Sequence, residues 1–187
     1  MPRRLIESTR VFKGLIFDVD RDRLFLDDGR ETVREVVRHP GGAGGLPIFA
    51  DGRVALVRQY RHPAGRELLE IPAGRIEEGE SPDECARREI EAETGARPGK
   101  MEKIAEFYST PGFCEEKLYV FLATGLETAR QDLDEDEALD VVYLSLDEAI
   151  ALAKKGEIED SKTLVALLLA ERRLKAVEHS KESRFNR

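Results

Sequence analysis

The sequence has no tryptophan, only two cysteines and no long hydrophobic run. Two cysteines cannot form a disulfide framework, and neither Cys85 nor Cys114 stands at the spacing of a zinc site. The longest aliphatic run, Leu164 to Ala170, is far shorter than the roughly 20 residues of a membrane-spanning helix. No apolar segment follows the N-terminal Met-Pro-Arg-Arg, so no signal peptide is evident. We therefore expect a cytoplasmic protein without a membrane partner.

An excess of basic residues is also missing. The chain has 30 lysines and arginines against 38 aspartates and glutamates, which gives a formal net charge of −8. A nucleic-acid partner calls for a basic surface, so we expect none. A phosphorylated small molecule is compatible with this balance, because a few arginines and a bound metal reverse the sign inside a pocket.

The 187 residues suffice for one domain with its own core and a small appendage. Residues 5–38 contain short β-prone runs separated by turns, which predict a small antiparallel meander. The glycine-rich run 39–45 predicts a flexible link and a domain boundary. We expect an N-terminal β subdomain over residues 1–43, a main domain over 44–176 and a flexible tail over 177–187.

The main domain mixes strands and helices, which indicates an α+β fold. Short apolar runs bounded by turn residues predict its strands, and N-cap serines predict two of its helices. The expected strands are Val54–Val57, Glu67–Ile71, Ile104–Tyr108, Leu118–Ala123 and Val141–Leu144, and the expected helices are 82–94, 146–155 and 161–174.

Three alternating aspartates in the N-terminal part, Asp18, Asp20 and Asp22, resemble the start of a calcium-binding loop. However, such a loop needs a glycine where Arg23 stands and a glutamate where Gly29 stands. We therefore assign no calcium site to them.

The most informative stretch is the 23-residue segment Gly74 to Ala96, GRIEEGESPDECARREIEAETGA. Ser81 and Glu84 form a capping box, and Gly95 suits the left-handed position at a helix end. Glu89 and Glu93 lie four residues apart on this helix and therefore on one face. Two stacked carboxylates repel unless a cation lies between them. A hard divalent ion, Mg²⁺ or alternatively Mn²⁺, is the natural partner.

This segment resembles the Nudix box, G-x5-E-x7-R-E-U-x-E-E-x-G-U. Ala92 departs from the pattern, since it stands where the first glutamate of the E-E pair is expected. The matching positions are Gly74, Glu80, Arg88, Glu89, Ile90, Glu93 and Gly95. The resemblance implies an α/β/α sandwich with a mixed sheet, the small N-terminal β subdomain being an addition to it. It also implies Mg²⁺-dependent hydrolysis of a nucleoside diphosphate linked to another moiety, by attack of water on phosphorus.

By the same resemblance, Glu89 and Glu93 are metal ligands, together with the backbone carbonyl of Ala73. Arg88 and Glu80 look like the pair that braces the loop against the helix. Because Ala92 removes one expected ligand, carboxylates outside the box are candidates to complete the site. These are Glu70 acting through water, Glu115 or Glu116, and the acidic-loop residues Glu135 and Glu137.

The run from Ser109 to Glu116 is similar to the S/T-P-G-F-x-x-E loop of the ADP-ribose pyrophosphatase branch of this family. That likeness implies hydrolysis of ADP-ribose to AMP and ribose 5-phosphate. It also implies that a glutamate of the acidic loop activates the attacking water, for which we favour Glu137 over Glu135. The implied substrate-binding residues are Arg61, Pro111 and Gly112, with Arg34 and Arg58 as further candidates.

In this branch the N-terminal strands pair with a second subunit, so the resemblance implies a homodimer. Two other functions stay open. One is a Nudix hydrolase of a different nucleoside diphosphate derivative, such as a nucleotide sugar or a dinucleotide. The other is a catalytically weak module that binds a nucleotide, for which Ala92 is the main support.

Overall fold

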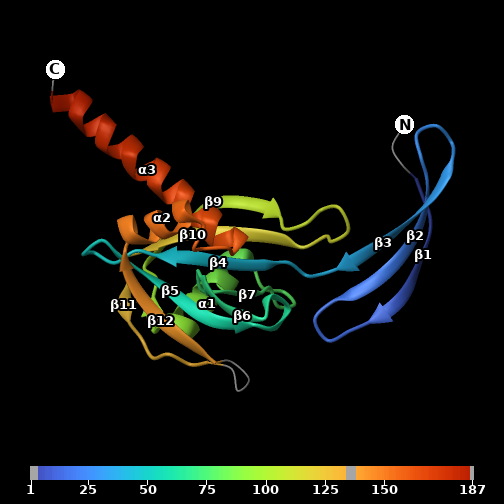
Figure 1. Cartoon of the computed structure of the whole chain (residues 1–187), viewed down its shortest axis with the longest axis horizontal. Coiled ribbons are helices and arrows are strands. Elements are labelled where there is room, and N and C mark those ends of the chain that lie inside the picture. The colour runs from blue at the N-terminus through green and yellow to red at the C-terminus, as the bar shows by residue number, and fades with distance from the viewer. Residues whose placement is uncertain (1–3, 134–137, 186–187) are drawn as a thin grey trace. The chain divides into compact units, whose positions relative to one another are not determined.

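The computed structural model describes residues 4–133 and 138–185 (Figure 1). The chain divides into two compact units. One consists of Met1–Gly42 with Phe107–Leu118, and the other of Ala43–Glu106 with Tyr119–Arg187. The first unit thus combines the N-terminal segment with a loop region that is distant from it in sequence.

The N-terminal segment forms an antiparallel sheet of β1 (Arg4–Lys13), β2 (Asp18–Phe25) and β3 (Glu31–Arg38), in the order β1-β2-β3. Gly29, at φ 83°, lies in the turn between β2 and β3, where the left-handed conformation favours glycine. The predicted meander is confirmed.

The remaining strands form three sheets. The four-stranded sheet has the order β7-β4-β10-β9, a three-stranded sheet has the order β12-β5-β6, and β11 pairs with β8. The bounds are β4 Gly42–Pro47, β5 Arg53–Arg61, β6 Arg66–Glu70, β7 Ala73–Arg75, β8 Ala96–Arg97, β9 Lys100–Tyr108, β10 Lys117–Thr124, β11 Glu127–Thr128 and β12 Leu139–Ser145, with a 3-10 turn, η1, at His62–Ala64.

The helices of the second unit are α1 (Pro82–Thr94), α2 (Leu146–Lys155) and α3 (Ser161–Phe185). Within this unit α1 packs against β5, β7 and β12, while α2 packs against α3, β5 and β12. The α3 helix continues beyond the predicted residue 174, because neither glycine nor proline interrupts residues 175–185. The α+β class is confirmed.

The glycine-rich run does not behave as the predicted flexible link, and that prediction was wrong. Residues 42–47 form the fully buried strand β4 inside the four-stranded sheet. A Cβ on Gly44 would lie 2.4 Å from Cβ of Ala73, and one on Gly45 would lie 2.8 Å from Cδ1 of Ile90. The glycines are therefore needed for close packing against β7 and α1, and their composition does not signal flexibility.

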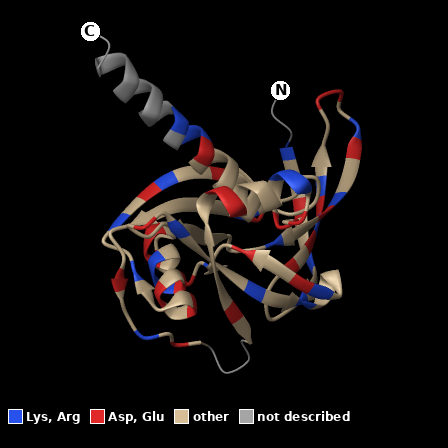
Figure 2. Ribbon diagram, turned by 60° about the vertical axis from the view of Figure 1, so that its left-hand side comes forward, with Lys and Arg blue, Asp and Glu red and all other residues tan. Residues whose placement is uncertain are grey.

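Acidic and basic residues are interspersed along the strands and helices (Figure 2). No helix of the described part of the chain is long and apolar enough to cross a membrane.

Candidate active site

The α1 helix has both ends fixed as predicted. Its N-cap Ser81 accepts a hydrogen bond from the Glu84 backbone N–H at 3.3 Å, and the Glu84 carboxylate accepts one from Ser81 N–H at 2.9 Å. Gly95 closes the helix at φ 66°. Glu89 and Glu93, 8% and 2% exposed, therefore lie on the buried side of a helix that cannot easily shift.

Glu89 is packed directly against Gly74, which lies in β7. A Cβ built on Gly74 would come within 1.8 Å of Oε1 of Glu89 and 2.3 Å of its carboxyl carbon. Only glycine leaves room for the carboxylate there. The same short strand begins with Ala73, whose carbonyl is the third predicted metal ligand.

Arg88 joins the loop before α1 to the helix. Its Nε and Nη2 donate to the Glu80 carboxylate at 2.9 and 3.0 Å, and its Nη2 also reaches the Arg75 carbonyl at 3.3 Å. The hydrogen bond from Arg88 lowers the pKa of Glu80. A further bond of 2.6 Å runs from Nη1 to Oε1 of Glu89. The predicted brace is thus present, and it also holds one of the two stacked glutamates.

Cys85 is fully buried on α1. Its sulfur lies 3.4 Å from the Arg75 carbonyl and 3.6 Å from the Gly74 carbonyl. Burial raises the pKa of the thiol to about 12. Cys85 is therefore a small neutral packing residue beneath β7.

Arg61, at the end of β5, forms a bidentate pair with Glu70, at the end of β6. Its Nε and Nη2 donate to the two oxygens of Glu70 at 2.8 and 2.9 Å. Lys162 of α3 binds the same carboxylate, whose side chain is 2% exposed. Burial alone would raise the pKa of Glu70, but the hydrogen bond from Arg61 and the charge of Lys162 outweigh it and lower the pKa to about 2. Glu70 is therefore an anion held by two cations.

The hydrogen bond with Glu70 raises the pKa of Arg61, and the charges of Glu70, Glu93 and Asp160 raise it further. The Arg61 side chain is 39% exposed, and its Nη1 has no hydrogen bond within residues 4–133 and 138–185. It thus has a donor left for a ligand.

Lys162 was not anticipated from the sequence. Its ammonium also donates to Asp160 at 3.0 Å, and Asp160 caps α3 by accepting from the Thr163 N–H at 2.9 Å. A lysine in the first turn of a helix opposes the helix dipole. This unfavourable placement is the signal that could have identified it.

The other predicted substrate-binding residues lie at two separate places. Arg34, Pro111 and Gly112 line one pocket of about 400 Å³ in the first unit. Arg58 lines a different pocket of about 340 Å³ in the second unit, beside Glu67 and Leu152. Glu116 lies near His39, with 3.6 Å between Oε1 and Nδ1.

Ala92 lines an open pocket of about 650 Å³ together with Arg88, Glu91, Arg97 and other residues. Glu91 binds Arg97 at 2.6 and 2.9 Å, in keeping with its projection away from Glu89. The backbone carbonyl of Ala92 accepts from the Asp132 N–H at 2.9 Å, which ties the start of the acidic segment to α1. Glu135 and Glu137 lie outside the described residues.

A divalent ion would find two buried carboxylates, Glu89 and Glu93, and the nearby carbonyl of Ala73. This oxygen donor set fits Mg²⁺ or Mn²⁺. Over residues 4–133 and 138–185 no group of three or more acidic, histidine or cysteine side chains forms a complete metal cluster. Glu89 and Glu93 are the candidate carboxylate ligands that the described part of α1 contains.

Comparison with known proteins agrees with this geometry. A family model described as a NUDIX domain matches residues 38–167. An ADP-ribose pyrophosphatase of Bacillus subtilis (strain 168) is 37% identical over 169 residues, covering 89% of this chain and 91% of that protein. A methanol dehydrogenase activator of Bacillus methanolicus is 38% identical over 166 residues, covering 88% and 90%. A crystal structure titled as an ADP compounds hydrolase shares the fold, with a TM-score of 0.82, 22% identity, and coverage of 94% and 96%.

Proposed function

The chain belongs to the Nudix hydrolase family, and from this premise we propose that it hydrolyses ADP-ribose to AMP and ribose 5-phosphate with the help of Mg²⁺. The observation that carries the proposal is the position of Arg61. The Arg61 side chain is partly exposed at the end of β5, and the charge of Glu93 is among those that raise its pKa, after the hydrogen bond with Glu70. A diphosphate that brings a metal ion needs both a cation and a carboxylate pair at one place.

In the proposed reaction, the oxygen of water forms a bond to one phosphorus while the bond from that phosphorus to the bridging oxygen breaks. Glu89, Glu93 and the Ala73 carbonyl would hold the metal. When bound, Mg²⁺ neutralises developing charge and lowers the pKa of coordinated water. Gly74 and Arg88 keep the Glu89 carboxylate in position for that task.

The proposed substrate-binding and catalytic residues have different roles. Arg61 binds the pyrophosphate through the side of its guanidinium that faces away from Glu70. Pro111, Gly112 and Arg34 are the other proposed substrate-binding residues, and they line one pocket of the first unit. Glu137, or alternatively Glu135, takes the proton from the attacking water. The name of the Bacillus subtilis relative supports the choice of ADP-ribose.

We also propose that the protein is a homodimer that uses its N-terminal sheet. In support, the N-terminal segment 4–38 exposes a set of large apolar side chains, with Leu15 99% exposed. They are Leu5, Val11, Phe12, Leu15, Ile16, Phe17 and Val33. Such a set is typical of a surface that another chain covers. Light scattering coupled to gel filtration should give the mass of a dimer, and the mass of a monomer would contradict this part of the proposal.

The decisive assay incubates the purified chain with ADP-ribose, with and without Mg²⁺, and separates the products by chromatography. We expect AMP and ribose 5-phosphate in equal amounts, and no turnover after chelation. A panel containing a nucleotide sugar and a dinucleotide should give lower kcat/KM values. A higher value for one of these would replace ADP-ribose as the substrate. Binding of ADP-ribose without any product would indicate a nucleotide-binding module instead.

A further inference from the structure

The loop between β9 and β10 is attached to β3 by its backbone. Val37 N–H donates to the Phe113 carbonyl at 2.8 Å, and Glu115 N–H donates to the Val37 carbonyl at 3.1 Å. These bonds form a short parallel bridge between Val37 and Cys114. The loop contains Pro111 and Gly112, so its position decides where these two residues are presented.

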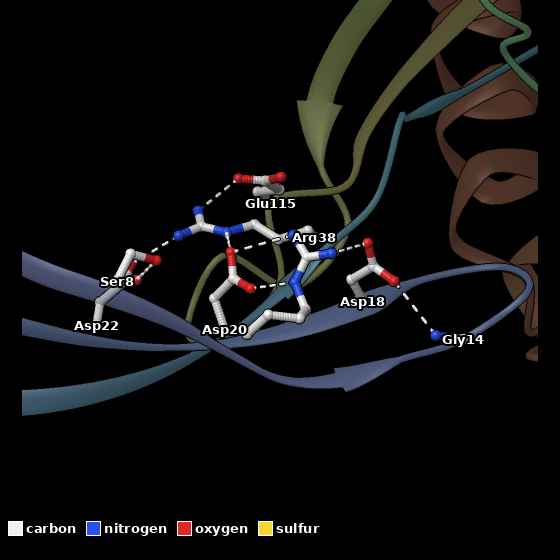
Figure 3. A network of polar contacts seen from close by, with 8 residues as sticks. Ser8, Gly14, Asp18, Asp20, Asp22, Arg38 and Glu115 are labelled. Atoms are coloured by element: carbon white, nitrogen blue, oxygen red, sulfur yellow. Dashed lines mark hydrogen bonds and ion pairs between the residues drawn. The ribbon is translucent and has the colours of Figure 1, made fainter.

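The side chain next to this bridge, Arg38, joins the loop to the sheet. Its Nη1 donates to Glu115 at 2.9 Å, its Nε to Asp20 at 2.9 Å, and its Nη2 to Asp22 at 2.7 Å (Figure 3). One guanidinium therefore connects two aspartates of β2 with one glutamate of the loop.

Asp20 and Asp22 are also bound by residues of β1, independently of Arg38. Because side chains two residues apart lie on the same face of a strand, both project from one face of β2. Each is 8% exposed. Arg10 of β1 binds Asp20 and Asp18, and the Ser8 hydroxyl donates to Asp22 at 2.6 Å (Figure 3). The sheet thus presents a preformed acceptor for the guanidinium.

The hydrogen bonds of this network favour the ionised forms of Asp20 and Arg38. The hydrogen bond from Arg10, followed by that from Arg38, lowers the pKa of Asp20. The hydrogen bond with Glu115, followed by that with Asp20, raises the pKa of Arg38. Glu115 has a side chain that is 43% exposed, and an ion pair of such exposure contributes little to global stability. Its principal effect is on where the loop lies.

We propose that Arg38 is a positioning residue for substrate binding, which fixes the Ser109–Glu116 loop through Glu115 and thereby places Pro111 and Gly112. Arg38 and Glu115 themselves line the same pocket as Pro111, Gly112 and Arg34. The inference rests on the proposed function for its effect on substrate, but its effect on the loop is independent of any substrate. It also explains the three alternating aspartates of β2 as a clamp for arginine.

The experiment compares Arg38→Met, Arg38→Lys and Glu115→Gln with the unchanged protein. Glu115→Gln weakens the link to the loop and leaves Arg38 bound to the sheet, so it serves even if Arg38→Met fails to fold. Arg23→Gln is the matched control, because Arg23 is an exposed arginine of β2 in the same sheet, and its ion pairs, with Glu7 at 3.6 Å and Glu31 at 3.8 Å, do not involve the loop. Two quantities are measured: amide hydrogen exchange of residues 109–116, and kcat and KM for ADP-ribose.

For Arg38→Met and Glu115→Gln we expect faster exchange in residues 109–116 and about a tenfold rise in KM, the size expected for a lost charge-assisted hydrogen bond. The value of kcat should change less than KM, and Arg38→Lys should recover part of the loss. The control should change neither quantity. Unchanged exchange in both variants would overturn the proposal, as would faster exchange with unchanged KM. If the unchanged protein does not act on ADP-ribose, the proposed function fails, while hydrogen exchange still decides whether Arg38 fixes the loop.

Discussion

The carboxylate of Glu89 rests on the backbone of Gly74, so closely that a Cβ on Gly74 would lie 1.8 Å from Oε1. Both residues belong to the segment that matches the Nudix box, and their contact explains why glycine stands at its first position in this chain. Because the obstructing atoms belong to the end of a flexible side chain, a larger residue would move Glu89 and leave the backbone in place.

This contact gives a first prediction. Gly74→Ala should retain stability to within about 1 kcal/mol, because Glu89 can rotate away. It should lower kcat by about 100-fold, since the displaced carboxylate no longer meets the metal at the required position. Thermal unfolding and steady-state kinetics measure the two effects. Wild-type kcat in this variant would show that the position of Glu89 against Gly74 is irrelevant to catalysis.

The second prediction concerns the proposed metal ligands. Glu93→Gln removes the charge of a buried carboxylate and should reduce kcat/KM by at least about 100-fold, together with Mn²⁺ affinity measured by electron paramagnetic resonance. Glu91→Gln is the matched control, because Glu91 lies on the same helix but binds Arg97. It should remain within about twofold of wild type. Robust turnover by Glu93→Gln would remove the metal-site assignment.

Position 92 is the third test. Ala92→Glu restores the carboxylate that the Nudix box contains, and should lower the Mg²⁺ concentration needed for half-maximal activity. Ala92→Gln adds similar volume without the charge and should leave the requirement as it is. An unchanged requirement in Ala92→Glu would mean that other carboxylates already complete the site.

A fourth prediction follows from the guanidinium of Arg61. Arg61→Lys keeps the charge but loses the planar fork, so KM for ADP-ribose should rise by roughly tenfold or more, with a smaller change in kcat. Arg53→Lys, at the other end of β5, is the control and should have no effect on KM. Equal KM values for Arg61→Lys and wild type would exclude Arg61 from pyrophosphate binding.

The fifth prediction is a pH dependence of stability. Glu70 has a pKa of about 2 in the folded protein, below its ordinary value of 4.5. Because the pKa of Glu70 is lower in the folded than in the unfolded protein, its ionised carboxylate stabilises the fold fully above about pH 4.5. This stabilisation is lost as the pH falls from about 4.5 to about 2. Its full size is on the order of 3 kcal/mol. Urea denaturation at several pH values, without added divalent ions, should show this decline. Glu70→Gln should be less stable at neutral pH and should show a shallower decline, and a decline equal to that of wild type would contradict the role of Glu70.

Much of the fold could be predicted because its determinants are local. Ser81, Glu84 and Gly95 specify both ends of α1 within one short segment, and the structure has them in those roles. The β1–β3 meander is likewise encoded by neighbouring turns. The strand β4 was missed because its glycines are required by Ala73 and Ile90, which are distant in sequence and make contact with it only after folding.

The candidate site likewise contains residues that a local motif predicts and residues that depend on distant parts of the sequence. The pairing of Arg88 with Glu80 could be predicted from one motif, since the two residues lie on one helix and in the loop before it. Lys162 could not be predicted, because its role depends on Glu70, a residue of another element and 92 positions away. Contacts of that kind follow from packing of the second unit and leave little trace in a local pattern.

Because Cys85 is a buried free thiol, its rate of reaction with a thiol reagent reports local opening of the structure around it. A thiol reagent cannot reach Cys85 unless the segment around Gly74 and Arg75 opens away from α1, whereas Cys114 is partly accessible. The two thiols belong to different units. The slow phase of modification therefore records how often the segment around Gly74 and Arg75 separates from α1, and suppression of that phase by a divalent ion would report binding at the proposed metal site without any enzymatic assay.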